Sequence, residues 1–116
     1  MHVQIFGTKS CPDTRKAERF FRERRVRIHF VDLKQKAATK GELRRFAQKF
    51  GVDALLDRDS KRYRARGLHA GSYTEAQLLD YLEEEPMMLV TPLIRNGNRL
   101  TLGHDEAEWR RWVEGE

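Results

Sequence analysis

The sequence contains a single cysteine, Cys11, among its 116 residues. One cysteine excludes an internal disulfide, so a thiol redox cycle would need a second thiol from another molecule. The four histidines show no spacing that is typical of metal ligands, and we therefore predict no metal site. A lone free cysteine also agrees with a reducing compartment, and we expect a cytoplasmic protein.

Long hydrophobic runs are missing as well. No apolar stretch approaches the roughly 18 residues that a membrane helix needs, and the N-terminus lacks the basic and apolar regions of a signal peptide. Hydrophobic residues make up 39% of the chain and charged residues 35%. Because the apolar residues recur at regular spacings, we interpret residues 1–116 as one folded domain and expect a monomer without a membrane partner.

The charge is unbalanced, with a formal net charge of +5. Basic residues concentrate in Arg15–Arg27, in Lys34–Lys49 and again in Arg58–Arg66. The few aromatic residues within these stretches do not interleave with the basic ones as a stacking platform for bases would require, so we predict no direct nucleic-acid binding. The charge instead favours acidic protein partners or small anions, or serves solubility alone.

The chain is organised around the stretch that leads into and out of Cys11. Val3–Phe6 has the pattern of a buried strand, and a helix is predicted to begin directly after the cysteine. A thiol at a helix N-terminus faces unpaired N–H groups and the positive end of the helix dipole, which favour the thiolate. Pro12 suits the first helical position, and Arg15 lies one turn on, where it can approach the sulfur or a bound oxyanion. The alternative is that Cys11 is a small hydrophobic residue in a loop.

The remaining elements follow from periodicity and turn signals. The first helix should extend to about Arg24, and a second strand, parallel to the first, should cover Val26–Leu33. A third strand is predicted at Leu89–Ile94, then a hairpin marked by Asn96-Gly97, a fourth strand at Arg99–Leu102, and a last helix capped by Asp105.

Between these parts lies a predicted helical insertion at about residues 38–85. Thr39 and Thr74 each open a helix with a capping box. The charged segment between those helices contains Arg58. Its bland interpretation is an exposed loop, and its functional interpretation is a loop that presents Arg58 to a bound anion; the residues do not decide between them.

The order β-α-β, helical insertion, β-β-α is that of an α/β, thioredoxin-like fold with a mixed four-stranded sheet. The motifs resemble the arsenate reductase (ArsC) family in its broad sense, which includes the Spx transcription regulators and the YffB-type proteins. The resemblance covers nearly the whole chain and rests on Cys11–Ala17, Phe30–Leu33, Glu42 and Leu43, Leu55 and Leu56, Tyr63, Gly67 and Leu68, Thr91–Ile94, Leu102 and Gly103, Asp105, Glu108 and Trp109.

The resemblance implies a cis peptide bond before Pro92, close to the cysteine. It implies that Cys11 is the catalytic nucleophile, that Arg15 stabilises its thiolate, and that glutathione resolves the covalent adduct. No bound cofactor is expected, and glutathione would be a co-substrate. As residues that contact the substrate or the external thiol we predict Ser10, Pro12, Thr14, Arg58, Thr91 and Pro92.

The sequence also departs from the family at positions that bear on the reaction. The arsenate reductases have an arginine just before the cis proline, where this chain has Thr91. They have a second arginine at the end of the next strand, where this chain has Leu102 or Gly103. Because an arsenate dianion needs two or three fixed donors, these replacements argue against efficient arsenate reduction. Spx regulators often carry a Cys-x-x-Cys switch, and Thr14 takes the place of the second cysteine.

Three functional hypotheses follow. The first is glutathione-dependent thiol redox chemistry through Cys11. The second is a non-catalytic, Spx-like regulator that binds RNA polymerase, which the basic surface and the missing arginines favour. The third is a true arsenate reductase that depends on glutathione and glutaredoxin. The first predicts an acidified, reactive thiol, whereas the second predicts that replacing Cys11 has no effect.

Overall fold

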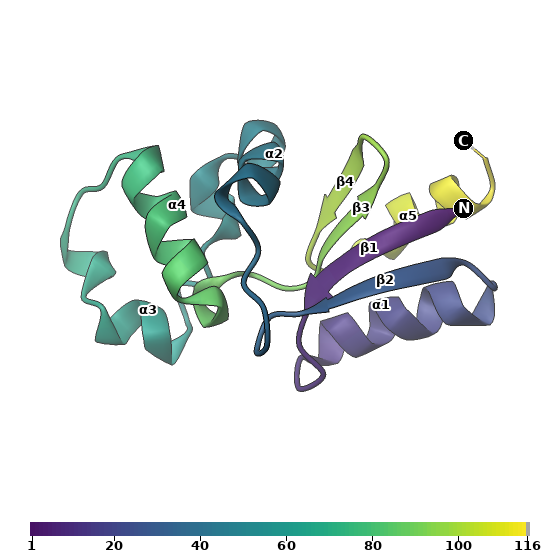
Figure 1. Ribbon diagram of the computed structural model, residues 1–116, viewed down its shortest axis with the longest axis horizontal. Helices are drawn as coiled ribbons and strands as arrows, with labels where there is room; N and C mark the ends of the chain where they lie inside the picture. The colour runs from purple at the N-terminus through teal and green to yellow at the C-terminus, as the bar shows by residue number, and fades with distance from the viewer. Residues whose placement is uncertain (116) are drawn as a thin grey trace. The chain divides into compact units, whose positions relative to one another are not determined.

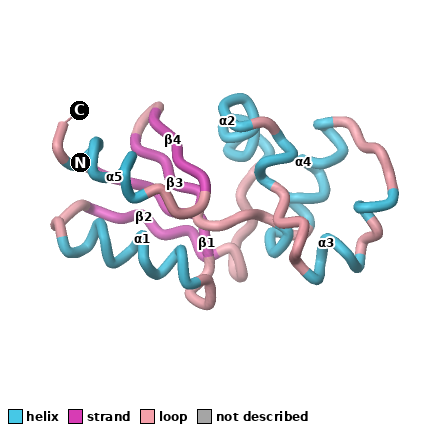
Figure 2. The backbone as a smooth tube through the Cα atoms, turned by 180° about the vertical axis from the view of Figure 1, so that it is seen from behind, coloured by secondary structure: helices cyan, strands magenta, loops and turns pink. Residues whose placement is uncertain are grey.

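The computed structural model describes residues 1–115, apart from the side chain of His69, and shows two compact units. The first unit comprises Met1–Asp32 and Thr91–Glu116, and the second comprises Leu33–Val90. The named strands all belong to the first unit, where they are drawn in magenta in Figure 2. The second unit contains the predicted helical insertion and extends a few residues beyond it on both sides.

The first unit is a sheet with two α-helices (Figure 1). Its elements are β1 (His2–Gly7), α1 (Pro12–Glu23), β2 (Arg27–Asp32), β3 (Leu93–Asn96), β4 (Arg99–Leu102) and α5 (Glu106–Val113). The strand order is β2-β1-β3-β4, with β1 and β2 parallel and the other pairs antiparallel. This is the mixed four-stranded sheet of the predicted thioredoxin-like fold, and the fold class is confirmed.

The core of this unit lies between one face of the sheet and the two helices. Val3 and Ile5 point from β1 toward buried side chains of α1 and α5. The ring centroids of Phe21 and Trp109 are 5.7 Å apart, and those of Phe21 and Trp112 are 6.2 Å apart. The apolar spacing in the sequence therefore identified the buried faces of both helices correctly.

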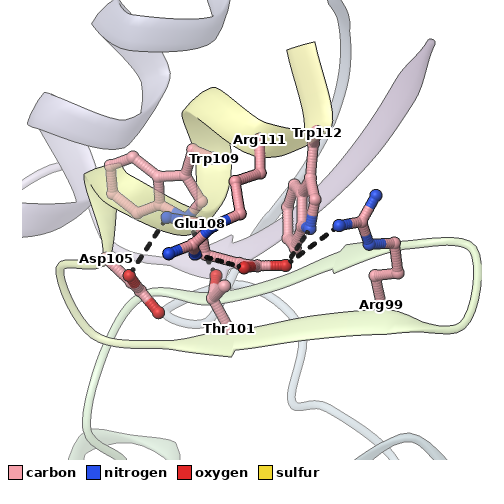
Figure 3. Close-up of polar contacts among 7 residues, drawn as sticks. All are labelled: Arg99, Thr101, Asp105, Glu108, Trp109, Arg111 and Trp112. Carbon is pink, nitrogen blue, oxygen red and sulfur yellow. Dashed lines mark hydrogen bonds and ion pairs between the residues drawn. The ribbon is translucent and has the colours of Figure 1, made fainter. Parts of the chain in front are cut away.

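Polar contacts around Glu108 link helix α5 to strand β4 (Figure 3). The carboxylate of Glu108 accepts hydrogen bonds from Arg111 at 2.8 Å, from the Trp112 indole at 2.8 Å and from Arg99 of β4 at 3.3 Å. Between two buried side chains, the Trp109 indole donates to Thr101 Oγ1 at 2.8 Å. The contacts give Glu108 and Trp109, two residues of the family motif, structural roles in this chain.

The third strand begins later than predicted, at Leu93 rather than at Leu89. Leu89 instead forms an isolated antiparallel bridge with Leu56 inside the second unit. Pro92 has no N–H to donate to a ladder, so regular pairing starts only after it. The expectation of a strand that contains Pro92 was wrong.

The turn between β3 and β4 also differs in detail from its sequence signal. Asn96 pairs with Arg99, so the two central residues are Gly97 and Asn98. Gly97 has a φ of 61° whereas Asn98 is not among the residues with positive φ. This combination is that of a type II′ turn, in which glycine takes the first central position, rather than the type I′ turn that Asn-Gly favours.

The second unit is helical. It contains α2 (Lys40–Phe50), η1 (Val52–Leu55), α3 (Lys61–Ala65), η2 (Leu68–Ala70), α4 (Glu75–Glu84) and η3 (Pro86–Met88). Both predicted capping boxes are present: Thr39 caps α2 together with Glu42, and Thr74 caps α4 together with Gln77.

Candidate functional site

Cys11 is the residue that caps the N-terminus of α1. Strand β1 ends at Gly7, and a short loop leads to Pro12, the first residue of the helix. The Cys11 N–H donates to the carbonyl of Thr8 at 3.2 Å, which closes this loop tightly. The half-buried sulfur thus lies at the positive end of a helix of 12 residues, as predicted.

Thr91 contacts the sulfur with both its side chain and its backbone. Its hydroxyl donates to Cys11 Sγ at 3.2 Å, and the thiol donates to the Thr91 carbonyl at 3.7 Å. The peptide bond between Thr91 and Pro92 is cis. The expectation of a cis proline close to Cys11 is therefore confirmed. The sequence did not predict the hydrogen bond from the Thr91 hydroxyl to the sulfur.

Thr14 lies one turn into α1 and is fully buried. Its Oγ1 makes no hydrogen bond of standard geometry with any residue that the structure describes. It nevertheless lies near enough to the sulfur to lower the pKa of Cys11. A buried hydroxyl without a partner is costly, and a thiolate would supply the acceptor that it lacks.

The space for Thr14 is created by Gly7 at the end of β1. A Cβ atom at Gly7 would lie 2.5 Å from Thr14 Oγ1 and 2.6 Å from its Cγ2. Only glycine leaves room for this side chain beside the sulfur.

The pKa of the Cys11 thiol is lowered, as the balance of opposing causes. Partial burial raises it, and this is the largest single cause. The hydroxyls of Thr14 and Thr91 and the backbone amides of Thr14 and Asp13 lower it, and together they outweigh burial. The amides act as weak hydrogen-bond donors to the sulfur, without the geometry of a regular side-chain cap.

Arg15 contacts the loop before the cysteine. Its guanidinium Nη1 donates to the carbonyl of Lys9 at 2.8 Å. The Lys9 ammonium in turn binds the buried carboxylate of Glu18 at 2.7 Å and lies 4.3 Å from the centre of the Phe30 ring. Arg15 thus helps to fix the loop, while its contact with the sulfur or with an oxyanion stays a prediction.

The other predicted site residues occupy different settings. Ser10 is exposed, with its Oγ 3.2 Å from Thr8 Oγ1, whereas Pro92 is buried. Arg58 belongs to the second unit, where it contacts the Tyr63 hydroxyl at 3.3 Å and Asp53 at 3.4 Å. The structure therefore gathers Cys11, Thr14, Thr91 and Pro92, and the proposed anion contact of Arg58 stays untested.

Three residues of the site were missed by the sequence interpretation: Gly7, Lys9 and Glu18. Glu18 is 5% exposed and is paired with both Lys9 and Arg22. The spacing of Glu18 and Arg22 by four residues was a usable signal for one of these pairs. The pairing of Lys9 with Glu18 depends on how the loop folds back along the helix, and local spacing does not encode it.

Among the described side chains, no group of three or more His, Cys, Asp or Glu is placed to hold a metal ion. Within residues 1–115, no helix combines the length and the apolar character that a membrane crossing requires.

The sequence of this chain matches a known protein family and two curated regulators. The model of the ArsC family matches residues 6–112. A global transcriptional regulator Spx 2 from Oceanobacillus iheyensis is 25% identical over 115 residues, covering 97% of this chain and 84% of the relative. A global transcriptional regulator Spx from Staphylococcus aureus is 25% identical over 113 residues, covering 96% and 86%.

Solved structures show the same fold. A YffB protein superposes with a TM-score of 0.87 at 22% identity and covers 96% of this chain and 98% of its own. An arsenate reductase from Vibrio cholerae superposes with a TM-score of 0.81 at 17% identity and covers 99% and 97%. At these identities the likeness extends to the fold, and the chemistry has to be argued from the site itself.

Proposed function

The chain belongs to the ArsC family, and on that premise we propose that it is a thiol-dependent oxidoreductase that uses glutathione and the single nucleophile Cys11. The observation that carries the proposal is the position of the Cys11 sulfur at the start of α1, where the Thr91 hydroxyl donates to it at 3.2 Å and its pKa is lowered. Because the thiol must stay reduced between turnovers, we place the protein in the cytoplasm.

The substrate of this reaction is a mixed disulfide between a protein or small thiol and glutathione. The Cys11 thiolate attacks the glutathione sulfur, and the substrate sulfur leaves as a thiolate that takes up a proton. A second glutathione thiolate then attacks the new disulfide at Cys11 and releases oxidised glutathione. The Cys11 thiolate is regenerated. In sum, one free glutathione thiol is consumed, and the substrate thiol and oxidised glutathione are released.

The residue before the cis proline supports a thiol substrate over arsenate. Thr91 presents a hydroxyl and a backbone carbonyl to the sulfur, and neither brings a positive charge. A dianion would need fixed cationic donors at this position, whereas an extended peptide such as glutathione needs backbone hydrogen bonds. We therefore expect no efficient turnover of arsenate.

The first test is the rate of alkylation of Cys11 by iodoacetamide as a function of pH. A midpoint well below that of an ordinary cysteine is expected, since the fold favours the thiolate. Cys11→Ser is the control that removes all signal, because the chain has no other cysteine. A midpoint at or above the ordinary value would overturn the assignment of Cys11 as a nucleophile.

The second test follows the covalent intermediate. Oxidised glutathione should form a mass-detectable adduct with the native chain and none with Cys11→Ser, and added glutathione should remove it. Reduction of a glutathionylated peptide should then depend on Cys11. An adduct that free glutathione does not resolve would contradict a catalytic cycle.

A second candidate function is that of a regulator that binds RNA polymerase. The observation that favours it is the match to global transcriptional regulators of the Spx type, which extends over 96–97% of this chain. In that case Cys11→Ser would leave binding unchanged, and charge reversals on the basic helices would weaken it. A pull-down with bacterial RNA polymerase tests this binding. Capture of the polymerase would support the regulator function, and a well-folded chain that captures none would eliminate it.

A further inference from the structure

A concave surface lies on the first unit, between α1 and the segment that opens α5. It has a volume of about 330 Å³. On α1 it is bordered by residues spaced three or four apart, which form one continuous stripe of the helix. The residues that line this surface, here named the α1–α5 groove, are Lys16, Arg19, Phe20, Glu23, Arg24, His104, Glu106 and Arg110.

Two of its guanidinium groups are held in place. The Arg24 guanidinium lies 3.8 Å from the centre of the Phe20 ring, and its Nη1 donates to the Phe20 carbonyl at 3.0 Å. Arg110 donates from Nε and Nη2 to one carboxylate oxygen of Glu106 at 3.1 and 2.7 Å, and it also faces the Phe20 ring. Side chains fixed in this way lose less conformational entropy when a ligand binds.

The groove favours carboxylates. The pKa of Glu106 is lowered, chiefly by its hydrogen bond to Arg110 and further by the charges of Arg110, His104 and Arg24, against the opposing effect of burial. One carboxylate of the chain itself is thus already bound here. Along the same stripe, Lys16 and Arg19 form no ion pair within the described part of the chain, so their charges are available to a partner.

We propose that the α1–α5 groove binds an acidic polypeptide segment of a partner protein. Its cations outnumber its two carboxylates, Glu23 and Glu106, so it attracts negative charge. Glu23 interrupts the positive stripe of α1, and Glu106 adds a second negative charge to the groove. This arrangement opposes a continuous phosphate backbone but suits a peptide whose acidic side chains are spaced apart. From Lys16 to Arg24 the stripe extends about 12 Å, the length of roughly four residues of extended chain.

This binding is independent of the thiol chemistry, because none of the groove residues contacts Cys11 among the described interactions. The test uses the full chain and fluorescence anisotropy at low salt. One probe is a fluorescein-labelled, glutamate-rich peptide, and the other is a labelled single-stranded DNA oligonucleotide of equal net charge. The variant Lys16→Glu/Arg19→Glu reverses the two unpaired charges. Its matched control, Arg44→Glu/Arg45→Glu, makes the same change of net charge at exposed positions of α2.

The peptide should bind the native chain more tightly than the DNA does, and binding should weaken with salt. The groove variant should lose about tenfold in affinity, since two exposed ion pairs become repulsive, and the control should lose about twofold or less. Equal losses in both variants would reduce the effect to net charge and overturn the proposal. Tighter binding of DNA, or no binding of the peptide at low salt, would overturn it as well.

Discussion

The sulfur of Cys11 has two hydroxyl neighbours with different hydrogen-bonding states. Thr91 already donates to the sulfur, whereas Thr14 is buried with no regular partner in the described structure. Ionisation of the thiol removes its donation to the Thr91 carbonyl and provides an acceptor for both hydroxyls. The site is therefore better satisfied with a thiolate than with a thiol, and this holds without a guanidinium on the sulfur.

Replacing Thr91 by valine tests the first hydroxyl. Thr91→Val keeps the shape of the side chain but removes the donor, so the pKa of Cys11 should rise. Alkylation at pH 7 should slow by about threefold to tenfold, the effect of one net hydrogen bond. Thr91→Ser retains the hydroxyl and should retain the rate. If serine slowed the reaction as much as valine does, packing rather than hydrogen bonding would explain the effect.

The contact between Gly7 and Thr14 gives a paired test of the second hydroxyl. Gly7→Ala places a methyl group 2.5 Å from Thr14 Oγ1 and should destabilise the first unit by about 1–3 kcal/mol. Adding Thr14→Ala removes the clash, so stability should return. Alkylation of Cys11 in this double variant should be slower than in the native chain, because the Thr14 hydroxyl is lost. Urea unfolding followed by tryptophan fluorescence measures the stability. Full recovery of the alkylation rate in the double variant would assign Thr14 a packing role only.

At the scale of elements, the attachment of α5 to β4 depends on the charge of Glu108. Burial raises the pKa of this carboxyl, but Arg111, Trp112 and Arg99 together lower it by more, so the net pKa lies below the ordinary value. A carboxyl with a depressed pKa in the folded state stabilises the fold above its unfolded pKa. That contribution disappears as the pH falls through the folded pKa.

The pH dependence of Glu108→Gln should follow from this. At pH 7 the variant should be less stable than the native chain by about 1 kcal/mol, a value reduced because the carboxylate is partly exposed. As the pH drops below about 4, the difference should shrink toward zero. The measurement is urea unfolding at both pH values, and both tryptophans lie in this region. Glu114→Gln, at an exposed position just beyond α5, should show no such difference.

Periodicity and capping signals predicted most elements, because those signals are local. The apolar spacing of α1 identified Phe20 and Phe21 as buried, and Thr39 and Thr74 marked helix starts correctly. Contacts across the chain were less accessible. Leu89 pairs with Leu56 in an isolated bridge rather than with a strand of the sheet, and no local pattern reports this pairing.

The same distinction applies to the site. The helix N-terminus and the cis proline were predicted, the first from local chemistry and the second from the family resemblance. The role of the Thr91 hydroxyl depends on two residues 80 positions apart, and the space for Thr14 depends on a glycine in the preceding strand. Such geometry follows from the packing of β1, α1 and β3, which the sequence pattern leaves unspecified.

At the scale of the whole molecule, the groups that lower the pKa of Cys11 all belong to the first unit. They are Thr14, Thr91 and Asp13, and the core that holds them is formed by β1, β3, α1 and α5. The second unit interrupts the chain between β2 and β3. Both strands pair with β1, where Phe6 faces Val31 on one side and Leu93 on the other. These two partners lie about 10 Å apart, twice the spacing of neighbouring strands.

This geometry predicts that the first unit can be produced without the second. Replacing residues 33–90 by a short glycine and serine linker should leave a folded unit, because the gap between β2 and β3 is small. A domain of about 60 residues is marginal, so its unfolding should need less urea than that of the full chain. Alkylation of Cys11 should nevertheless keep a low pH midpoint. A folded excised unit with an ordinary midpoint would mean that the second unit contributes to the thiolate, and Arg58 would be the first residue to replace in the full chain.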